Sequence, residues 1–482
     1  GAPPVSGVSP AAPSGSPVPT TAGPGRTTQI DYATNRRATR RFMLALAGVS
    51  LLIALTQSAL ALLFVYGGAI SVNRLLVLGA IYAWPMVLAW GLARRWSWPR
   101  IVGGVALYML AMLVLVVARS TPNQTFAGVA GWLFSQVAVP LTITVLVGGS
   151  GRIRAVAPYL LPPTLLLTGA SVLALQIVAQ DVDSSPAWVL GLVGSIGAYP
   201  TLAVIAFGPW LLLAWPVYRL GRWLADAYRR KRFSDLGYLV GIYWFLILFT
   251  SALPAMESVG VIGFVQLLTW LWWPLAWVAL RGHLAPPANP PTLLVLRVFQ
   301  RDAQVERLFD RVIERWRLTG NTVLIAGTDV ISRTLDPDDL FVFLDGTLAE
   351  RFIARPEQVA ARIAGFDRLP DPDGRYRINE CYCFDSTWQA ALNELVAQSD
   401  VVLMDLRGFR AENSGCRYEL GVLARAMQAQ RVVVLHDRST ARTVAEAEIP
   451  ASAAERFDWV AADQLNNVLA GRILSALLAN GR

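Results

Sequence analysis

The sequence carries little charge and few cysteines. Of its 482 residues, 54% are hydrophobic and only 16% are charged, a charged share well below that of ordinary soluble proteins. The three cysteines, Cys381, Cys383 and Cys416, all lie in the second half of the chain, which excludes a disulfide framework and suits a reducing compartment. Cys381, Cys383 and His436 could ligate a metal, but the second ligand pair expected of a zinc site is missing.

The familiar catalytic signatures are also missing. The chain contains no Walker loop, no G-x-G-x-x-G, no G-x-S-x-G and no H-E-x-x-H. The usual phosphate-binding loop, nucleophile elbow and zinc-protease helix are therefore excluded. We accordingly predict no metal site and no bound cofactor.

Negative charge is scarce in the first part of the chain. Residues 1–282 carry 19 Lys+Arg and 6 Asp+Glu, a net +13, whereas residues 283–482 carry 23 and 27, a net −4. Excess basic residues within an apolar segment are typical of loops between membrane spans. The acidic second half gives no support to nucleic-acid binding, so no nucleic-acid partner is predicted.

Long apolar runs dominate residues 36–282. Runs of about 18 or more apolar residues indicate helices that span a lipid bilayer. One run is too long for a straight span and is interrupted by GSIGAYP, which predicts either a kinked helix or a half-helix leading into a full one. This predicts an all-α polytopic transmembrane bundle. Its about eight spans are 42–66, 74–93, 101–118, 127–147, 155–179, 189–218, 236–254 and 260–280.

These predicted spans contain no Asp, Glu, Lys or His. A transporter coupled to ions or protons normally needs an ionisable group inside the membrane. A carrier or channel is therefore disfavoured, which leaves an anchor, an oligomerisation platform or a sensor of a membrane ligand.

Basic residues alternate between the two sides of the predicted spans. The loops on the side of the N-terminus hold 17 basic residues, whereas those on the other side hold only Arg74 and Arg119. Because loops rich in Lys and Arg stay in the cytoplasm, we predict a multi-pass protein of the cell membrane with both termini cytoplasmic.

The pattern differs at both ends of this apolar region. Residues 1–35, rich in Pro, Gly, Ala and Ser, predict a disordered tail, and residues 283–291 predict a Pro-rich linker. Within 292–482 strand-like and helix-like segments alternate, which predicts an α/β cytoplasmic domain with a mostly parallel sheet. The predicted strands are 292–299, 321–327, 375–384, 400–406 and 431–437, and the predicted helices are 303–318, 336–353, 356–366, 386–398, 416–430 and 463–480.

Polar side chains follow three of these strands. In parallel sheets covered by helices, ligands bind beyond the carboxyl ends of the strands. The candidate nucleotide-binding residues at these ends are Arg301, Thr328, Asp405, Arg407 and Arg410. The arginines could meet phosphates or simply be solvated, and the aspartate could orient a ribose hydroxyl or cap the loop.

One glutamate, Glu419, lies just after the last of these loops. If the next helix begins near Cys416, Glu419 is its third residue and stabilises the helix dipole by about 0.3–1 kcal/mol. With Ser414 as the cap, Glu419 falls too late for a capping box. Alternatively, a carboxylate held ionised there could stabilise or attack a developing positive charge at a sugar carbon. The residues alone leave both roles open.

The sequence around Glu419 carries a family resemblance. NSGCRYELG (413–421) resembles the nucleophile segment of nucleoside 2-deoxyribosyltransferases, with Asn413 and Cys416 in place of that pattern's Asp and Thr. The matching residues are Ser414, Gly415, Tyr418, Glu419, Leu420 and Gly421. The longer block LNELVAQSDVVLMDLRGFRAENSGCRYEL also resembles the core of Toll/interleukin-1 receptor (TIR) domains. There the matches are Ser399, Cys416, Glu419 and Leu420.

The resemblance implies a flavodoxin/TIR-like sheet and a catalytic Glu419. The matching glutamate is the nucleophile in deoxyribosyltransferases, and in catalytic TIR domains it supports cleavage of nicotinamide from NAD. Ser414 and Cys416, at matched positions, are then expected to line the nucleotide site. Because TIR enzymes act when assembled, the resemblance also implies a homo-oligomer.

Three functions remain open on the sequence. The first is a membrane-anchored, TIR-like signalling or effector protein that cleaves the N-ribosyl bond of NAD or a related nucleotide. The second is a non-enzymatic membrane receptor or scaffold with a self-associating TIR-like domain. The third is a transporter with a regulatory cytoplasmic domain.

Overall fold

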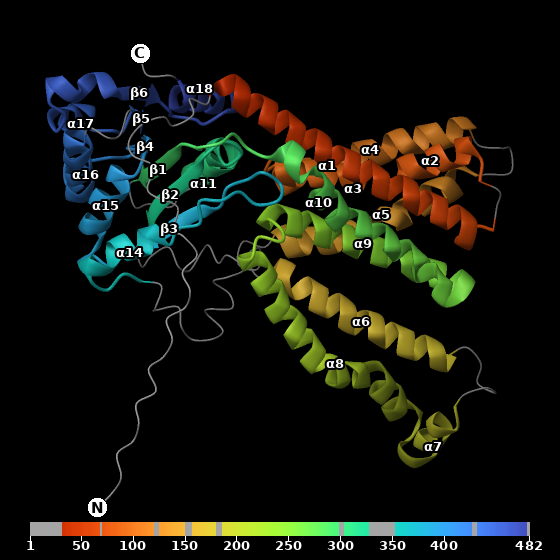
Figure 1. Cartoon of the computed structure of the whole chain (residues 1–482). Coiled ribbons are helices and arrows are strands. Elements are labelled where there is room, and N and C mark those ends of the chain that lie inside the picture. Colours follow the sequence, from red (N-terminus) through yellow and green to blue (C-terminus); the bar gives the residue numbers. More distant parts are fainter. Residues whose placement is uncertain are drawn as a thin grey trace, which may run out of the picture.

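The computed structural model shows a helical first part joined to a parallel sheet with helices on both faces (Figure 1). The described residues are 31–67, 70–119, 125–149, 157–179, 186–297, 303–326, 352–426 and 431–479. The first helix, α1 (Tyr32–Leu60), begins after Asp31, whose side chain accepts a hydrogen bond from Thr34 N at 2.8 Å. Residues 32–35 are thus helical, and the predicted tail 1–35 extends too far.

Five helical stretches in the described part of the chain are long and apolar enough to cross a membrane. They are Tyr32–Val65, Trp98–Arg119 (α4), Phe126–Gly148 (in α5, Phe126–Gly149), Ala198–Arg229 (α8) and Asp235–Leu284. A bent pair, α2 (Val72–Tyr82) and α3 (Pro85–Ala93), gives a sixth if counted as one span. Length and composition thus indicate a membrane protein, and the total of about eight spans stays a prediction.

The stretch Asp235–Leu284 is a hairpin with two helical legs. The legs are α9 (Asp235–Val259) and the continuous pair η2 (Gly260–Leu271) and α10 (Trp272–Leu284). Trp273 Nε1 donates to Gly237 O at 2.8 Å, so residues far apart in the sequence meet because the chain reverses. The reversal occurs at Gly260, whose φ of +68° is readily available only to glycine. The legs correspond to the two segments predicted at 236–254 and 260–280.

The long apolar run at 189–218 is broken at Gly197, where φ is +91°. The short helix α7 (Ala187–Ile196) there leads into the long helix α8, which is the second of the two arrangements predicted. Helix α6 (Ala157–Ala179) lies beside α8, and Trp210 Nε1 donates to Ser171 Oγ at 2.9 Å between them.

The second part of the chain is built on a parallel sheet, as predicted. Its strands are β1 (Thr292–Arg297), β2 (Asn321–Ala326), β3 (Ile378–Tyr382), β4 (Val401–Asp405), β5 (Arg431–His436) and β6 (Phe457–Ala461), in the order β3-β2-β1-β4-β5-β6. Every named pair is parallel. This is the six-stranded order of the doubly wound Rossmann sheet, 3-2-1-4-5-6, which has one edge strand, β3, more than the five-stranded flavodoxin-like sheet that the sequence predicted.

Strand β1 explains why both faces of the sheet are covered. Successive side chains of a strand point to opposite faces, and Leu294 and Leu296 enter one core while Leu293 and Val295 enter the other, all nearly fully buried. The helices packed on the first core are α14 (Val359–Ala364), α15 (Trp388–Ala397), α16 (Ser414–Arg425) and α17 (Arg442–Ala447). Those on the second are α11 (Ala303–Leu308), η3 (Phe309–Ile313), α12 (Glu314–Trp316) and α18 (Asn467–Leu478).

Three elements of the second part were not predicted, namely α17, β6 and the short helix η6 (Ala451–Arg456). One predicted helix is untested over most of its length. Strand β6 buries only Phe457 and Val460, too few apolar side chains for the alternation that identifies a strand. Helix α17 is short and flanked by polar residues. Of the predicted helix 336–353, only the last two residues lie within the described chain, and Ile353 there forms a parallel bridge with Cys383.

Candidate functional site

The candidate site lies at the carboxyl edge of the sheet, beside the point where the strand order reverses. β1 and β4 are neighbours, with Arg297 opposite Asp405 at their carboxyl ends. The chain leaves β1 toward one face of the sheet and leaves β4 toward the other. Such a switch point is where open parallel sheets bind their ligands. The loop after β4 leads directly to α16, which carries Glu419.

Glu419 is a buried carboxyl with an oxygen that has no partner. Glu419 is 3% exposed, and its side-chain oxygen Oε2 is buried and accepts no hydrogen bond. Burial raises the pKa of this carboxyl to about 8, because an apolar environment disfavours the charged form. A buried polar atom left unsatisfied costs stability and calls for an explanation.

These facts correct two expectations about Glu419. Helix α16 begins at Ser414 after the cap residue Asn413, so Glu419 is not the third residue and does not lie in the first turn. The helix dipole, which acts mainly within the first turn, therefore does not account for this residue. Nor is the carboxyl held ionised, because its raised pKa keeps it mostly protonated at neutral pH.

The two family-matched neighbours of Glu419 differ in their surroundings. Cys416 is buried, and burial together with the nearby Glu419 raises the pKa of its thiol to about 12. It is therefore an unreactive thiol, since the thiolate is the nucleophilic form. Ser414 is exposed at the start of α16, on the same loop but in contact with solvent.

Asp405 and Arg407 lie side by side, and their side chains bind each other. Arg407 Nε donates to Asp405 Oδ1 at 2.8 Å and Nη2 donates to Oδ2 at 2.6 Å. Their side chains are 4% and 5% exposed, so the pair is a buried bidentate ion pair. Arg407 is thus not a solvated surface arginine. Arg410 is exposed, and its backbone N donates to Asn413 Oδ1 at 2.8 Å.

The remaining predicted site residues do not add to the candidate site. Arg301 and Thr328 lie outside the described residues. Cys381 and Cys383 face each other with their sulfurs 3.7 Å apart. Over the ranges that the structure describes, no cluster of three or more His, Cys, Asp or Glu side chains could hold a metal ion.

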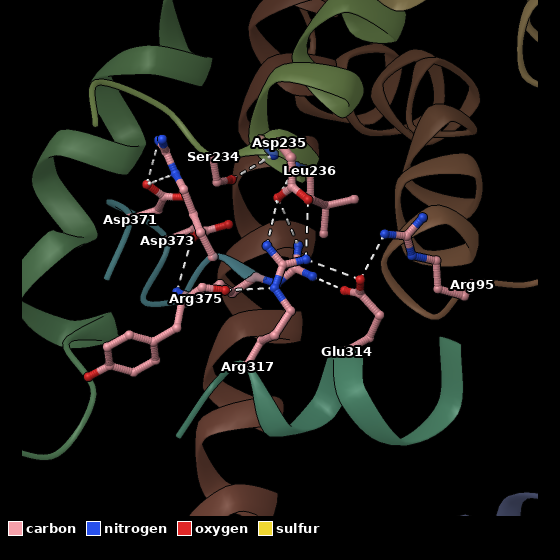
Figure 2. A network of polar contacts seen from close by, with 12 residues as sticks. Arg95, Ser234, Asp235, Leu236, Glu314, Arg317, Asp371, Asp373 and Arg375 are labelled. Carbon is pink, nitrogen blue, oxygen red and sulfur yellow. Dashed lines mark hydrogen bonds and ion pairs between the residues drawn. The ribbon is translucent and has the colours of Figure 1, made fainter. Parts of the chain in front are cut away.

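A second polar cluster, which the sequence did not suggest, precedes β2 and β3 and so lies at the amino edge of the sheet. Figure 2 shows its residues. There Arg317 and Arg375 meet Asp235, from the start of α9, and Glu314. Burial alone would raise the pKa of Glu314, but Arg95, Arg375 and Arg317 lower it to about 2. The only sequence signal was a run of charges, DPDGRYR, before β3.

Comparisons of the chain with protein-family models, with curated proteins and with solved structures give no match. The class of protein is therefore argued from the fold and the site alone.

Proposed function

We propose that this chain is a membrane-anchored, TIR-like signalling or effector protein that cleaves the N-ribosyl bond of NAD or a related nucleotide. The observation that supports this most is the orphaned, buried Glu419 Oε2 near the switch point of a parallel sheet. A buried polar atom without a partner calls for an explanation, and a bound ligand is one. A perturbed carboxyl at a ligand-binding edge is typical of functional sites.

The raised pKa of Glu419 suits a cationic substrate. In NAD the nicotinamide ring is a pyridinium cation, and a positive charge within a few ångströms favours the ionised carboxyl. As the N-glycosidic bond breaks, its electron pair leaves with the base and the ribose carbon gains positive charge. The Glu419 carboxylate stabilises that charge, and water then completes the hydrolysis.

The same proposal includes the layout of the molecule. About eight spans form the anchor, residues 292–482 form a cytoplasmic domain, and both termini face the cytoplasm, as the distribution of basic residues favours. Assembly of several copies in the membrane activates the domain. A reporter that is active only outside the cell, fused at residue 290, should give no signal, and a strong signal would overturn this topology.

The test of the activity is release of free base by the full-length chain in lipid nanodiscs, tethered to force assembly. NAD and a panel of nucleosides are the substrates. Glu419→Gln should lower turnover at least about 100-fold, because the carboxylate is needed mainly in the transition state. Glu412→Gln is the matched control, since Glu412 is an exposed residue of the same loop and its change should leave turnover intact. Equal release by wild type and Glu419→Gln would show that Glu419 is not the catalytic group.

The buried pair of Asp405 and Arg407 favours a second candidate, the non-enzymatic scaffold. Both side chains that could have met a ribose and a phosphate hold each other instead. If the assembled wild type releases no base from any substrate while its assembly still triggers a response in cells, the scaffold is supported and the enzyme is rejected.

A further inference from the structure

The contact between the helical part and the sheet includes a largely buried ionic network (Figure 2), beside the neutral hydrogen bonds that Asn35 Nδ2 donates to Arg315 O and Thr319 Oγ1. Arg317 Nη1 lies 3.2 Å from Asp235 Oδ2 and 3.1 Å from Glu314 Oε1. Arg95, in the turn between α3 and α4, lies 2.9 Å from the same Glu314 oxygen, and Arg375 also donates to Glu314. The Arg317 and Arg375 side chains are 4% and 3% exposed. Opening this contact would break these ion pairs and expose their charged groups to water.

A second ion cluster lies beside the first. Lys231, in the turn between α8 and α9, places Nζ 2.7 Å from Asp367 Oδ2 and 3.7 Å from Asp371 Oδ1. Arg377 Nη2 lies 2.9 Å from Asp371 Oδ1 and donates to Tyr228 O, at the end of α8, at 2.6 Å. Helices from the apolar part therefore meet the segment before β3 at several charged points.

The two cations that the helical part supplies from its turns have unusual backbones. Arg95 has φ of +52° and Lys231 has φ of +56°, the left-handed region that favours glycine at helix ends. The chain keeps a long charged side chain at both positions. Strained backbones of this kind gather where a contact or a switch requires them.

On the sheet side the contact is made by Glu314 and Arg317, at the end of α12, and by one hairpin, residues 367–377. Its tip approaches α10 so closely that a Cβ on Gly374 would lie 2.2 Å from Leu284 O. Its base is fixed to β3, because Asp367 N donates to Asn379 Oδ1 and Asn379 Nδ2 donates to Asp367 O, each at 2.9 Å. The hairpin is thus tied to the edge strand β3.

Two elements connect this contact to the edge that carries Glu419. The helix α11–η3–α12 starts after the carboxyl end of β1 and ends next to Arg317. Helix α15 meets the hairpin at one end, where Arg368 donates to Gln398. At its other end Trp388 packs edge-on against Tyr418, with ring centroids 5.4 Å apart. Tyr418 precedes Glu419 in α16.

We propose that the hairpin 367–377 is a coupling element that passes a movement of the membrane helices to α16. In the docked state both ion clusters are closed. A shift of the α3–α4 and α8–α9 turns opens them, releases the hairpin with β3, and through α15 loosens the packing around Tyr418. The two discrete states are docked and undocked, as a switch requires. This inference holds equally for an enzyme and for a scaffold.

The chain offers a direct probe of the docked state, because Lys231 is its single lysine. A zero-length carbodiimide joins an amine to a carboxyl only where the two are in contact. Applied to the full-length chain in nanodiscs, it should link residue 231 to residue 367, as read by peptide mass spectrometry. Lys231→Arg keeps the charge but removes the amine, so it should abolish this link. A wild type without the link would overturn the docked arrangement.

The coupling itself is tested by opening the cluster around Asp235 and Arg317 and measuring the effect on α16, at the carboxyl edge of the sheet. Asp235→Asn should lower the 231–367 cross-link at least several-fold and speed amide hydrogen exchange of residues 413–425. Asp226→Asn is the matched control: Asp226 pairs with Arg229 at 3.3 Å on an exposed face of α8, so neither readout should change. If Asp235→Asn leaves the link intact, a second variant, Arg317→Gln, opens the same cluster from the other side. Exchange of 413–425 that stays at the wild-type rate after the link is lost would overturn the proposal.

Discussion

Among single residues, Glu419 carries a buried carboxyl oxygen without a hydrogen-bond partner, and this is the observation on which the proposed ligand site rests. The protein keeps a carboxyl in an apolar site where a leucine would pack without an unsatisfied oxygen. Asp405 shows the contrary case, because a neighbouring arginine satisfies both of its oxygens. A buried acid with no partner and one with a bidentate partner respond differently to pH and to substitution.

The first prediction concerns the pH dependence of stability through Glu419. The folded pKa, about 8, lies above the ordinary value of 4.5, so the folded chain holds this proton longer than the unfolded chain. Stability from this group is complete below about pH 4.5 and is lost as pH rises toward 8, at most about 1.4 kcal/mol per pH unit. Glu419→Gln should remove this loss, so its melting temperature relative to wild type should rise from pH 5 to pH 8.

Thermal melts of the full-length chain in detergent at several pH values measure that difference. The buried Asp373, whose pKa burial raises to about 6, also titrates in this window. It is present in both proteins and cancels in the comparison. Parallel pH profiles for wild type and Glu419→Gln would mean that Glu419 is ordinary and solvated.

The second prediction concerns the buried ion pair of Asp405 and Arg407. Arg407→Gln leaves the Asp405 carboxylate buried without its counter-ion, which typically costs about 3–5 kcal/mol. The melting temperature should therefore fall by many degrees. Arg410→Gln, at an exposed position in the same loop, should change stability by less than about 0.5 kcal/mol. If both variants melt alike, Arg407 is free to serve a ligand and the closed pair is not structural.

At the scale of elements, the hairpin 367–377 makes the third prediction. Gly374 combines φ of +82° with the close approach to Leu284 O, so Gly374→Ala should strain the backbone by about 1–2 kcal/mol and push the hairpin off α10. Gly408→Ala is the control, because Gly408 has φ of +75° with nothing within 4 Å of a Cβ. Both should melt lower, but only Gly374→Ala should lose the cross-link between residues 231 and 367. Loss of the link in both would show that strain alone opens the contact.

Some elements of the fold could be predicted from the sequence and others could not. Buried parallel strands such as β1, β4 and β5 are continuous apolar runs, and the lengths between them fit helices, so the sheet was predictable. The edge position of β3 and the existence of β6 were not, because strand order and pairing depend on contacts between distant segments. The motif singled out Glu419 as a candidate, but its sixth position in α16 depends on where the helix begins, and its protonation depends on burial, and the sequence gives neither.

The ionic contact shows the same limit more strongly. Asp235 and Arg317 are 82 positions apart, and neither belongs to a pattern that a helix or strand period reveals. In the sequence each is a single charged residue at one end of an apolar or amphipathic segment. Only the folded chain brings them within 3.2 Å.

In the whole molecule, the Pro-rich segment predicted as the linker 283–291 begins only after Leu284, because residues 283–284 end helix α10. A Pro-rich segment favours an independent domain, whereas the ion clusters tie that domain to the helices. The fourth prediction follows from both. Residues 292–482 alone should be expressed as a folded but weakened unit, since Arg317, Arg375 and Arg377 lose Asp235, Tyr228 and their burial. Those arginines become solvated, so the isolated domain should be soluble. Its melting temperature should be lower than that of the full-length chain. An isolated domain as stable as the full chain would show that the clusters contribute nothing to its stability.

If the Glu419 carboxyl acts on a cationic ligand, its protonation state must change when that ligand binds. Infrared difference spectra between wild type and Glu419→Gln isolate this one carboxyl in the full-length chain. At pH 7 we predict a protonated-carboxyl band that loses intensity when NAD is added, because the cationic ring favours the ionised form. A band that stays unchanged with NAD and with every other cationic nucleotide would contradict the account and leave Glu419 as a packing residue.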